Sequence, residues 1–212
     1  MMNYAYNELF LSDAMMNLGE MTEYAFYALH DDSDRAFRQF IISGYAGRFQ
    51  VGDPLVISGM SGTELYKAIK EKSGISSNGL PKALTKYDTD VYYWIGYITA
   101  FYQWWSNRSF KSIVGAIKNE DYMRLYPALH TTSEERAAEA INDLVIKRIQ
   151  ASRLQEYRKR MGYTQAMLAE KSGVNLRTLQ QYEIGDKDIK KASASSVIAL
   201  AKSLLCEPDD LL

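Results

Sequence analysis

The sequence predicts an all-α protein that consists of a helical N-terminal domain followed by a second helical domain. Apolar residues recur at steps of three and four through most of the 212 residues, which is the period of an amphipathic helix. Polar residues that can cap a helix precede several of these runs. The segment PLVIS (54–58) could be a short extended stretch, but it has no obvious partner strand.

Two amphipathic helices are predicted near the N-terminus. Ser12 can cap the first, which reaches about Leu29 and carries one apolar stripe. The second covers the run SDRAFRQFIISGYAG, residues 33–47, directly after two aspartates. We expect this second helix to bury Phe37, Phe40 and Ile41.

Two capping boxes predict where later helices begin. Ser61 and Glu64 fit the S-x-x-E pattern, in which each side chain accepts a hydrogen bond from the other residue's backbone N–H. The helix that they open should cover LYKAIKEKSG. Thr132 and Glu135 fit the same pattern, and their helix could continue without a breaker to Met161. Such a helix would join the two domains.

Three further helices are predicted between the capping boxes. Asp88 can cap an aromatic helix that extends to Trp105. Ser109 opens a run that continues through Ile117, and Pro127 should end the helix formed by NEDYMRLY.

The aromatic helix has more rings than one buried stripe can hold. We expect Tyr97, Phe101 and Trp105 to belong to the core, because aromatic stripes usually do. Rings at other angles around the helix could form an exposed patch for a protein partner. The candidate anchors of such a patch are Tyr102 and Trp104.

Composition is typical of a soluble globular protein, with 47% hydrophobic and 24% charged residues. The single cysteine, Cys206, excludes an intramolecular disulfide and fits a reducing compartment. The N-terminus has neither the basic stretch nor the apolar run of a signal peptide. The aromatic stretch from Val91 to Trp105 is shorter than the roughly 20 residues that a membrane span needs. We therefore expect a soluble, cytoplasmic protein without membrane contact.

The net charge of -1 hides an asymmetry along the chain. Residues 1–145 contain 13 basic and 18 acidic side chains, whereas the remaining residues contain 12 basic and 8 acidic ones. A basic segment beside an acidic one indicates that one part meets a polyanion and the other a different partner. A solvated basic face is the alternative, because most basic clusters have no other role. We place the domain boundary after residue 147, which gives domains 1–147 and 148–212.

Sequence motifs for catalysis are missing. The chain has no phosphate-binding glycine loop, no H-E-x-x-H and no C-x-x-C. Its two histidines, His30 and His130, each lie at a predicted helix end, where an exposed or hydrogen-bonded imidazole is the commoner state. We expect no enzyme activity, no catalytic residue, no cofactor and no metal site.

The C-terminal segment has the pattern of a helix-turn-helix, two short helices that share a small core across a tight turn. Apolar residues at suitable spacing could form that core. The predicted boundaries, in chain order, are a helix end at Gly162, a cap at Thr164, a turn at Ser172 and Gly173, a cap at Asn175, a loop around Gly185 and a last helix from about Ser193.

This segment resembles the Xre family, the lambda-repressor-like DNA-binding domain, over roughly residues 150–212. The matching features are T-Q-x-x-L-A, then G-V, then a short helix that ends in a hydrophobic residue, Glu, any residue and Gly. In such domains the second helix of the motif lies in the major groove. The chain departs from the family pattern after this helix, because Ile184 replaces a polar residue and the following loop lacks a proline.

The resemblance implies which residues face DNA. Arg177 would bind the O6/N7 edge of guanine and Gln181 the N6/N7 edge of adenine. Thr164 and Thr178 would hold phosphates, as would the lysines after the second helix. The full set of implied DNA-binding residues is Thr164, Gln165, Asn175, Leu176, Arg177, Thr178, Gln181, Lys187 and Lys190.

Alternatives remain for some of these residues. Leu176 could complete the core, Thr178 could bond a local carbonyl, and the lysines could simply be solvated. The resemblance also implies an ion pair between Glu183 and Arg158 inside the domain, which we interpret as structural.

The order of the domains resembles antitoxins of toxin-antitoxin operons, which neutralise a toxin and repress their own promoter. The segments FRQFIISGYAGRFQVGDPLVISGMSGTELYKAI and YWIGYITAFYQWWSNRSF also resemble the leader domain of Xre-type antitoxin-like proteins of Gram-positive bacteria. These resemblances imply a repressor that binds operator DNA as a homodimer and a toxin through its N-terminal domain. A small-molecule- or signal-responsive repressor without a toxin partner is the alternative, and it should have an apolar pocket in the N-terminal domain.

Overall fold

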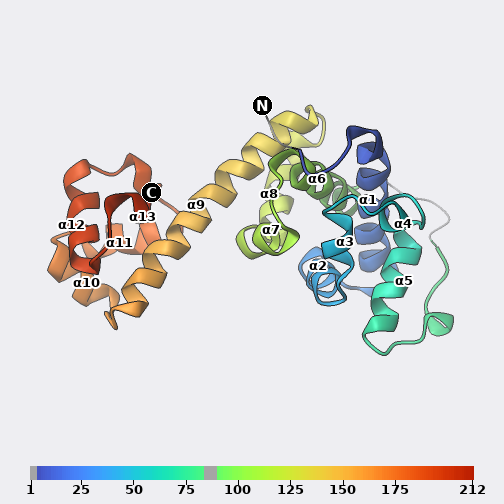
Figure 1. Ribbon diagram of the computed structural model, residues 1–212, viewed down its shortest axis with the longest axis horizontal. Helices are drawn as coiled ribbons and strands as arrows, with labels where there is room; N and C mark the ends of the chain where they lie inside the picture. Colours follow the sequence, from blue (N-terminus) through green and yellow to red (C-terminus); the bar gives the residue numbers. More distant parts are fainter. Residues whose placement is uncertain (1–3, 84–89) are drawn as a thin grey trace. The chain divides into compact units, whose positions relative to one another are not determined.

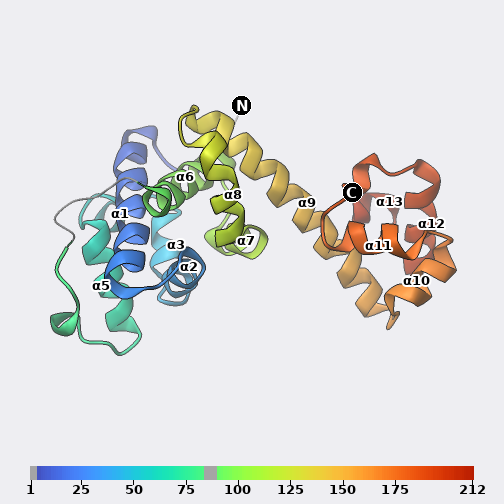
Figure 2. The ribbon, with the colours of Figure 1, turned by 180° about the vertical axis from the view of Figure 1, so that it is seen from behind.

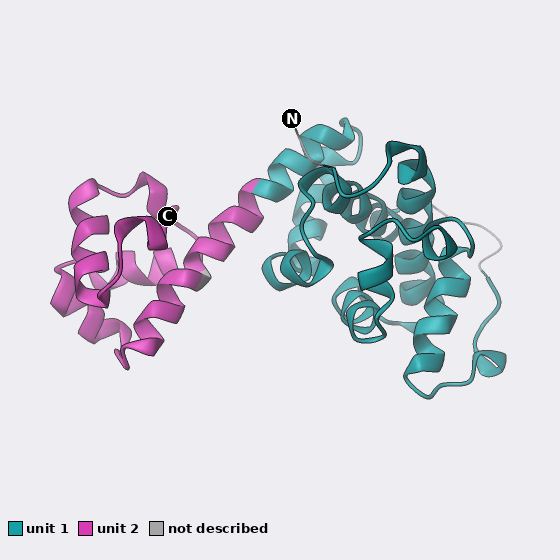
Figure 3. Ribbon diagram, viewed as in Figure 1, with its two compact units in different colours: residues 1–142 teal, residues 143–212 magenta. Residues whose placement is uncertain are grey.

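The computed structural model describes residues 4–83 and 90–212 and divides the chain into two compact units (Figures 1 and 3). Unit 1 is Met1–Asn142 and unit 2 is Asp143–Leu212. All regular secondary structure in the described ranges is helical, which confirms the all-α prediction. Among the described residues, no helix combines the length and the hydropathy that crossing a bilayer requires.

Unit 1 contains eight α-helices among its described residues and the start of a ninth (Figures 1 and 2). Two 3-10 helices, η1 (Glu8–Phe10) and η2 (Ser77–Gly79), lie among them. The α-helices are α1 (Leu11–Leu29), α2 (Ser33–Ile42), α3 (Tyr45–Phe49), α4 (Pro54–Ile57), α5 (Gly62–Lys72), α6 (Val91–Ser106), α7 (Phe110–Ala116), α8 (Asn119–Leu129) and α9 (Glu134–Arg160).

Helices α1 and α6 form the centre of unit 1, and each has a glycine where the other helix lies very close. A Cβ atom on Gly96 would lie 2.0 Å from the Leu18 carbonyl oxygen, and one on Gly19 would lie 2.9 Å from the Tyr93 ring. The Thr22 hydroxyl spans the two helices by donating to the Tyr92 carbonyl at 2.7 Å. Leucine or isoleucine at these glycines would hold the helices apart, so the core depends on small residues here.

Several predicted helix starts are confirmed. The Ser61 hydroxyl accepts the Glu64 N–H at 3.2 Å, and the Glu64 carboxylate accepts the Ser61 N–H at 2.8 Å, which completes the capping box of α5. The Ser109 hydroxyl accepts the Ser112 N–H at 3.2 Å at the start of α7.

Other predicted starts are corrected by the structure. Ser12 lies inside the first turn of α1, because the chain becomes helical earlier at η1, where Asn7 caps by accepting the Leu9 N–H at 3.0 Å. Asp88 lies outside the described residues, and the Asp90 carboxylate caps α6 by accepting the Tyr92 N–H at 2.9 Å.

The start of α9 also differs from its prediction. The Ser133 hydroxyl accepts the Arg136 N–H at 3.4 Å, whereas the Thr132 hydroxyl donates to the Leu129 carbonyl at 2.8 Å. Thr132 is therefore engaged with the end of the preceding helix. From Glu134, α9 continues without interruption to Arg160, and the boundary between the two units falls inside it.

Two proline segments of unit 1, at Pro54 and Pro127, were predicted wrongly. PLVIS is not extended, because Asp53 accepts the Leu55 N–H at 3.0 Å and Pro54 at the first helical position needs no N–H donor, so α4 forms. Pro127 does not end α8, which continues to Leu129. A proline two residues from the helix end removes one hydrogen bond, and the last turn keeps its His130 N–H bond to the Tyr126 carbonyl.

The aromatic helix α6 buries other rings than predicted: the core was expected to hold Tyr97, Phe101 and Trp105. Phe101 is buried, and Tyr97 and Trp105 are half-buried. The prediction that Tyr102 and Trp104 anchor a protein partner was wrong. Tyr102 is 0% exposed and Trp104 is 4% exposed, so neither ring lies on the surface.

Both corrected anchors are satisfied inside unit 1. The Tyr102 hydroxyl donates to the Asn142 side chain at 3.1 Å. The Trp104 indole N–H donates to the Tyr6 carbonyl at 2.8 Å, and the Tyr4 ring stacks on Trp104 at 4.0 Å. The N-terminal segment covers the ring of Trp104, and α9 bonds the hydroxyl of Tyr102. Neither residue is therefore available as an anchor.

Unit 2 contains the C-terminal part of α9 and four shorter α-helices around their own core. The helices are α10 (Gln165–Ser172), α11 (Leu176–Glu183), α12 (Ala194–Leu204) and α13 (Pro208–Leu211), with η3 (Ile189–Lys191) before α12. Leu154, Leu168, Leu179, Leu200 and Leu204 are among the buried side chains that pack together here.

Candidate nucleic-acid interface

Helices α10 and α11 are joined by a short turn whose ends are capped. The Thr164 hydroxyl accepts the Met167 N–H at 3.1 Å at the start of α10. Gly173 ends α10 in the left-handed conformation at a φ of 69°, where glycine has no Cβ penalty. The Asn175 side chain then accepts the N–H groups of Arg177 and Thr178 at 2.9 and 3.4 Å. The predicted boundaries of the motif are therefore confirmed.

The two helices share a small apolar core. Its buried residues include Leu168 and Ala169 from α10, Val174 from the turn, and Leu179 and Tyr182 from α11. Because these positions use one stripe of each helix, the remaining stripe of α11 faces away from the core.

A buried ion pair ties α11 to α9. The Arg158 guanidinium donates from Nε to Glu183 Oε1 at 2.6 Å and from Nη2 to Glu183 Oε2 at 2.9 Å. Its Nη1 donates to the Tyr163 carbonyl at 2.8 Å, and the Gln165 amide donates to Glu183 Oε2 at 2.8 Å. The pair is the one that the resemblance implied, and its bonds connect α9, the start of α10 and the end of α11.

The pair's electrostatics follow from this geometry. The bidentate hydrogen bond from Arg158 to Glu183 raises the pKa of the guanidinium, and partial burial opposes that effect. Arginine is charged at every physiological pH, so the guanidinium of Arg158 stays charged in this pair.

The structure places the nine predicted contact residues in unit 2 at or near the surface. Arg177 and Gln181 are four residues apart and share the outward face of α11, with Arg177 exposed and Gln181 half-buried. Leu176 is 40% exposed, so it is not closed into the core. Thr164, Asn175, Lys187 and Lys190 are exposed, and Gln165 and Thr178 are half-buried.

Some of these side chains already have a structural role. Asn175 uses its side-chain oxygen as the cap of α11, and Thr164 uses its hydroxyl oxygen as the cap of α10. One amide hydrogen of Gln165 is bonded to Glu183. These three residues therefore present to DNA only the donors or acceptors that remain.

The sequence analysis missed one residue of this surface. Gln180 is exposed on α11, three residues after Arg177. Residues three and four apart are neighbours on a helix surface, so the spacing from Arg177 could have identified it.

Residues 154–211 match the family model of the helix-turn-helix. This part of the chain is a helix-turn-helix domain. The helix-turn-helix is a DNA-binding element of transcription regulators. Comparisons with curated proteins and with solved structures give no match.

Proposed function

We propose that this protein is a sequence-specific repressor in which the helix-turn-helix domain inserts α11 into the major groove of its operator. The outward stripe of α11 carries this proposal, because it presents Arg177 and Gln181 beside each other while the opposite stripe is buried. Arginine and glutamine are the side chains that read guanine and adenine by two hydrogen bonds each.

Phosphate contacts complete the proposed complex. The N–H groups at the starts of α10 and α11, with Thr164 and Thr178 nearby, suit phosphate oxygens on either side of the groove. Asn175 and Leu176 lie where α11 enters the groove, and Gln165 lies at the start of α10. Lys187 and Lys190 follow α11 and would neutralise the backbone.

Alanine at the two base-reading positions should weaken operator binding. We expect Arg177→Ala and Gln181→Ala each to reduce affinity about 5- to 150-fold, because a lost bidentate contact costs about 1–3 kcal/mol. Gel shifts with the promoter of the protein's own operon measure this. Lys202→Ala, an exposed change on α12, is the control and should bind like the wild type. Unchanged affinity in the double variant would contradict the proposal.

The lysines should affect salt dependence and not sequence preference. Lys187→Ala and Lys190→Ala should each reduce the slope of log affinity against log salt by about 0.9, since one phosphate contact is lost. Titrations at several salt concentrations, with operator and with unrelated DNA, measure the slopes. A slope equal to that of the wild type in both variants would show that neither lysine contacts a phosphate.

We further propose that the repressor binds as a homodimer. Two helix-turn-helix domains reach half-sites about 34 Å apart, one turn of the duplex. Sedimentation of the complex with the operator should give two chains per site, and one chain per site would refute the dimer.

For unit 1 we propose binding of the cognate toxin of a toxin-antitoxin operon. The charge asymmetry supports a separate partner, because residues 1–145 are acidic and the remainder is basic. If a toxic gene is adjacent, co-expression of the full chain should rescue growth. The double variant Arg177→Ala and Gln181→Ala should still rescue while failing to repress, which separates the two activities. Failure to rescue, or a harmless neighbour, would refute the antitoxin role.

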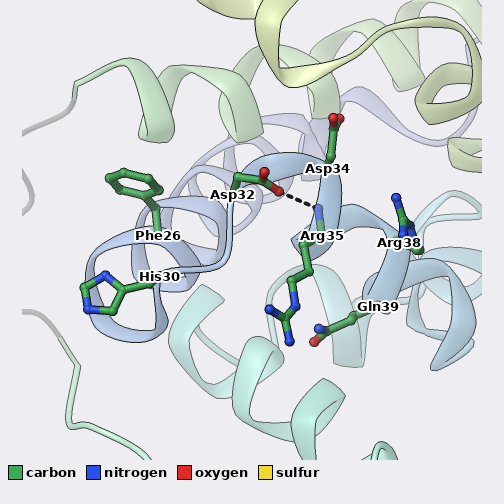
Figure 4. A pocket seen from close by; sticks show the side chains of 7 residues that line it. All are labelled: Phe26, His30, Asp32, Asp34, Arg35, Arg38 and Gln39. Carbon is green, nitrogen blue, oxygen red and sulfur yellow. Dashed lines mark hydrogen bonds between the residues drawn. The ribbon is translucent and has the colours of Figure 1, made fainter.

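The alternative is a signal-responsive repressor, and a cavity of unit 1 is a candidate site for its signal, although the charged lining of this cavity differs from the apolar pocket that we expected. This cavity has a volume of about 530 Å³ and a mostly charged lining (Figure 4). Two of its charged side chains are engaged in bonds, since the Asp32 carboxylate accepts the Arg35 backbone N–H and the Arg35 side chain forms an ion pair with Asp31 at 2.9 Å. The lining residues are Phe26, His30, Asp32, Asp34, Arg35, Arg38 and Gln39.

A further inference from the structure

A second cavity of unit 1 is lined by five aromatic side chains. We call it the aromatic recess, and its volume is about 170 Å³. Helix α6 contributes Tyr93, Trp94 and Tyr97, while α8 and its C-cap contribute Tyr126 and His130. Helices α6 and α8 pack against each other, which brings together rings that lie some thirty residues apart in the chain.

The rings are held in defined orientations. Trp94 and Tyr126 meet edge to face at 5.6 Å and 69°. Tyr93 and Tyr97 stack at 6.0 Å, and Tyr126 and His130 stack at 4.5 Å. His130 Nδ1 lies 2.8 Å from the Tyr126 carbonyl oxygen, which fixes the imidazole beside the recess. The walls are therefore preorganised.

Carboxylates act on the tyrosines of the recess. The Tyr97 hydroxyl donates to Glu134 Oε1 at 3.0 Å. Burial, and then the bond and charge of Glu134, raise the pKa of Tyr97 to about 12. Burial raises the pKa of Tyr93 as well, with smaller contributions from the charges of Glu23 and Glu20. The charges of nearby carboxylates therefore act on the tyrosines of the recess in addition to burial.

We propose that the aromatic recess binds the alkylated ammonium head group of a small quaternary ammonium compound. Aromatic faces carry a negative quadrupole and attract cations, most strongly where several rings surround a desolvated charge. The carboxylates add a longer-range attraction of the same sign. The volume is below the roughly 300–1,000 Å³ of pockets for whole drug-sized ligands, so it matches a head group. The proposal concerns unit 1 and does not depend on DNA binding.

Choline and its uncharged isostere 3,3-dimethyl-1-butanol test the cation requirement. Titration calorimetry of the full chain at constant ionic strength should give saturable binding of choline. The isostere has the same shape without the charge, so it should bind at least about tenfold more weakly, or 1.4 kcal/mol. Equal affinities for the two compounds would show that the recess binds by apolar contact alone, and they would overturn the proposal. Absence of saturable choline binding would overturn it as well.

Variants locate the binding in the recess. Tyr126→Leu should weaken choline binding at least about tenfold, whereas Tyr126→Phe keeps the aromatic face and should bind like the wild type. The matched control is Tyr45→Leu, another half-buried tyrosine that lies on α3 and does not line the recess. Choline affinity in Tyr126→Leu equal to that of the wild type would overturn the proposal.

The conservative variant Glu134→Gln separates loss of charge from loss of folding, because a folding defect would weaken binding of choline and of its isostere equally. Glu134→Gln removes the negative charge and leaves an oxygen that can accept the Tyr97 hydroxyl. It should weaken choline binding and leave binding of the isostere unchanged. Equal losses for both ligands, or no loss for either, would show that the carboxylate does not act on a bound cation.

Discussion

Arg158→Leu should unfold the helix-turn-helix domain under conditions in which the wild type is folded. The substitution leaves the Glu183 carboxylate buried without its bidentate partner, at an expected cost of about 3–5 kcal/mol. Such a cost is a large fraction of the stability of a small domain. Urea unfolding followed by circular dichroism measures the change, and operator binding should be lost together with the fold.

A surface ion pair on the same helix is the matched control. Arg160 bonds Glu156 at 2.6 Å, but its side chain is 65% exposed. Arg160→Leu should therefore cost less than about 1 kcal/mol. The double variant Arg158→Leu and Glu183→Leu removes both charges and should be more stable than the single Arg158→Leu variant. If Arg158→Leu and Arg160→Leu prove equally stable, the pair is not a structural element of the domain.

Gly96→Ala should disrupt the centre of unit 1. The new Cβ atom would lie 2.0 Å from the Leu18 carbonyl oxygen and 2.3 Å from the Thr22 hydroxyl oxygen. Backbone at that distance cannot move aside as a flexible side chain can, so α1 and α6 must separate. Over-packing of a core costs about 1–3 kcal/mol and occasionally more, and we expect about 3 kcal/mol or above here. Thermal unfolding of the full chain measures the loss.

Gly115→Ala is the control for the change in helix propensity. Gly115 also lies in an α-helix, α7, but a Cβ atom there would have nothing within 4 Å. Alanine in such a position stabilises a helix by roughly 0.5–1 kcal/mol relative to glycine. The two variants should thus differ in sign, and a stable Gly96→Ala protein would contradict the close approach of α1 and α6.

Helix starts could be predicted from the sequence where only one residue at the start can act as the cap. Ser61 with Glu64, Thr164 and Asn175 each bond an N–H two or three residues along, a contact that depends only on neighbouring residues. The prediction failed at Thr132 because Ser133 follows it and takes the cap. Two adjacent hydroxyl residues satisfy the same local rule, and the preceding helix end decides between them.

Burial of the aromatic residues could not be predicted in the same way. Helix periodicity identifies which rings share a stripe, but it does not say how many neighbours surround the helix. The N-terminal segment and α9 cover Trp104 and Tyr102 of α6, and both contacts join residues at least 40 positions apart. The aromatic recess depends on the packing of α6 against α8 for the same reason.

The amino-acid order determined the helical class of this protein, the turn between α10 and α11, and the polar stripe of α11, since these depend on contacts within a few residues. Tertiary structure decided how closely α1 and α6 approach, which aromatic side chains are covered, and where a recess remains. Those properties arise from packing between distant segments, and close packing depends on the shapes of both partners at once.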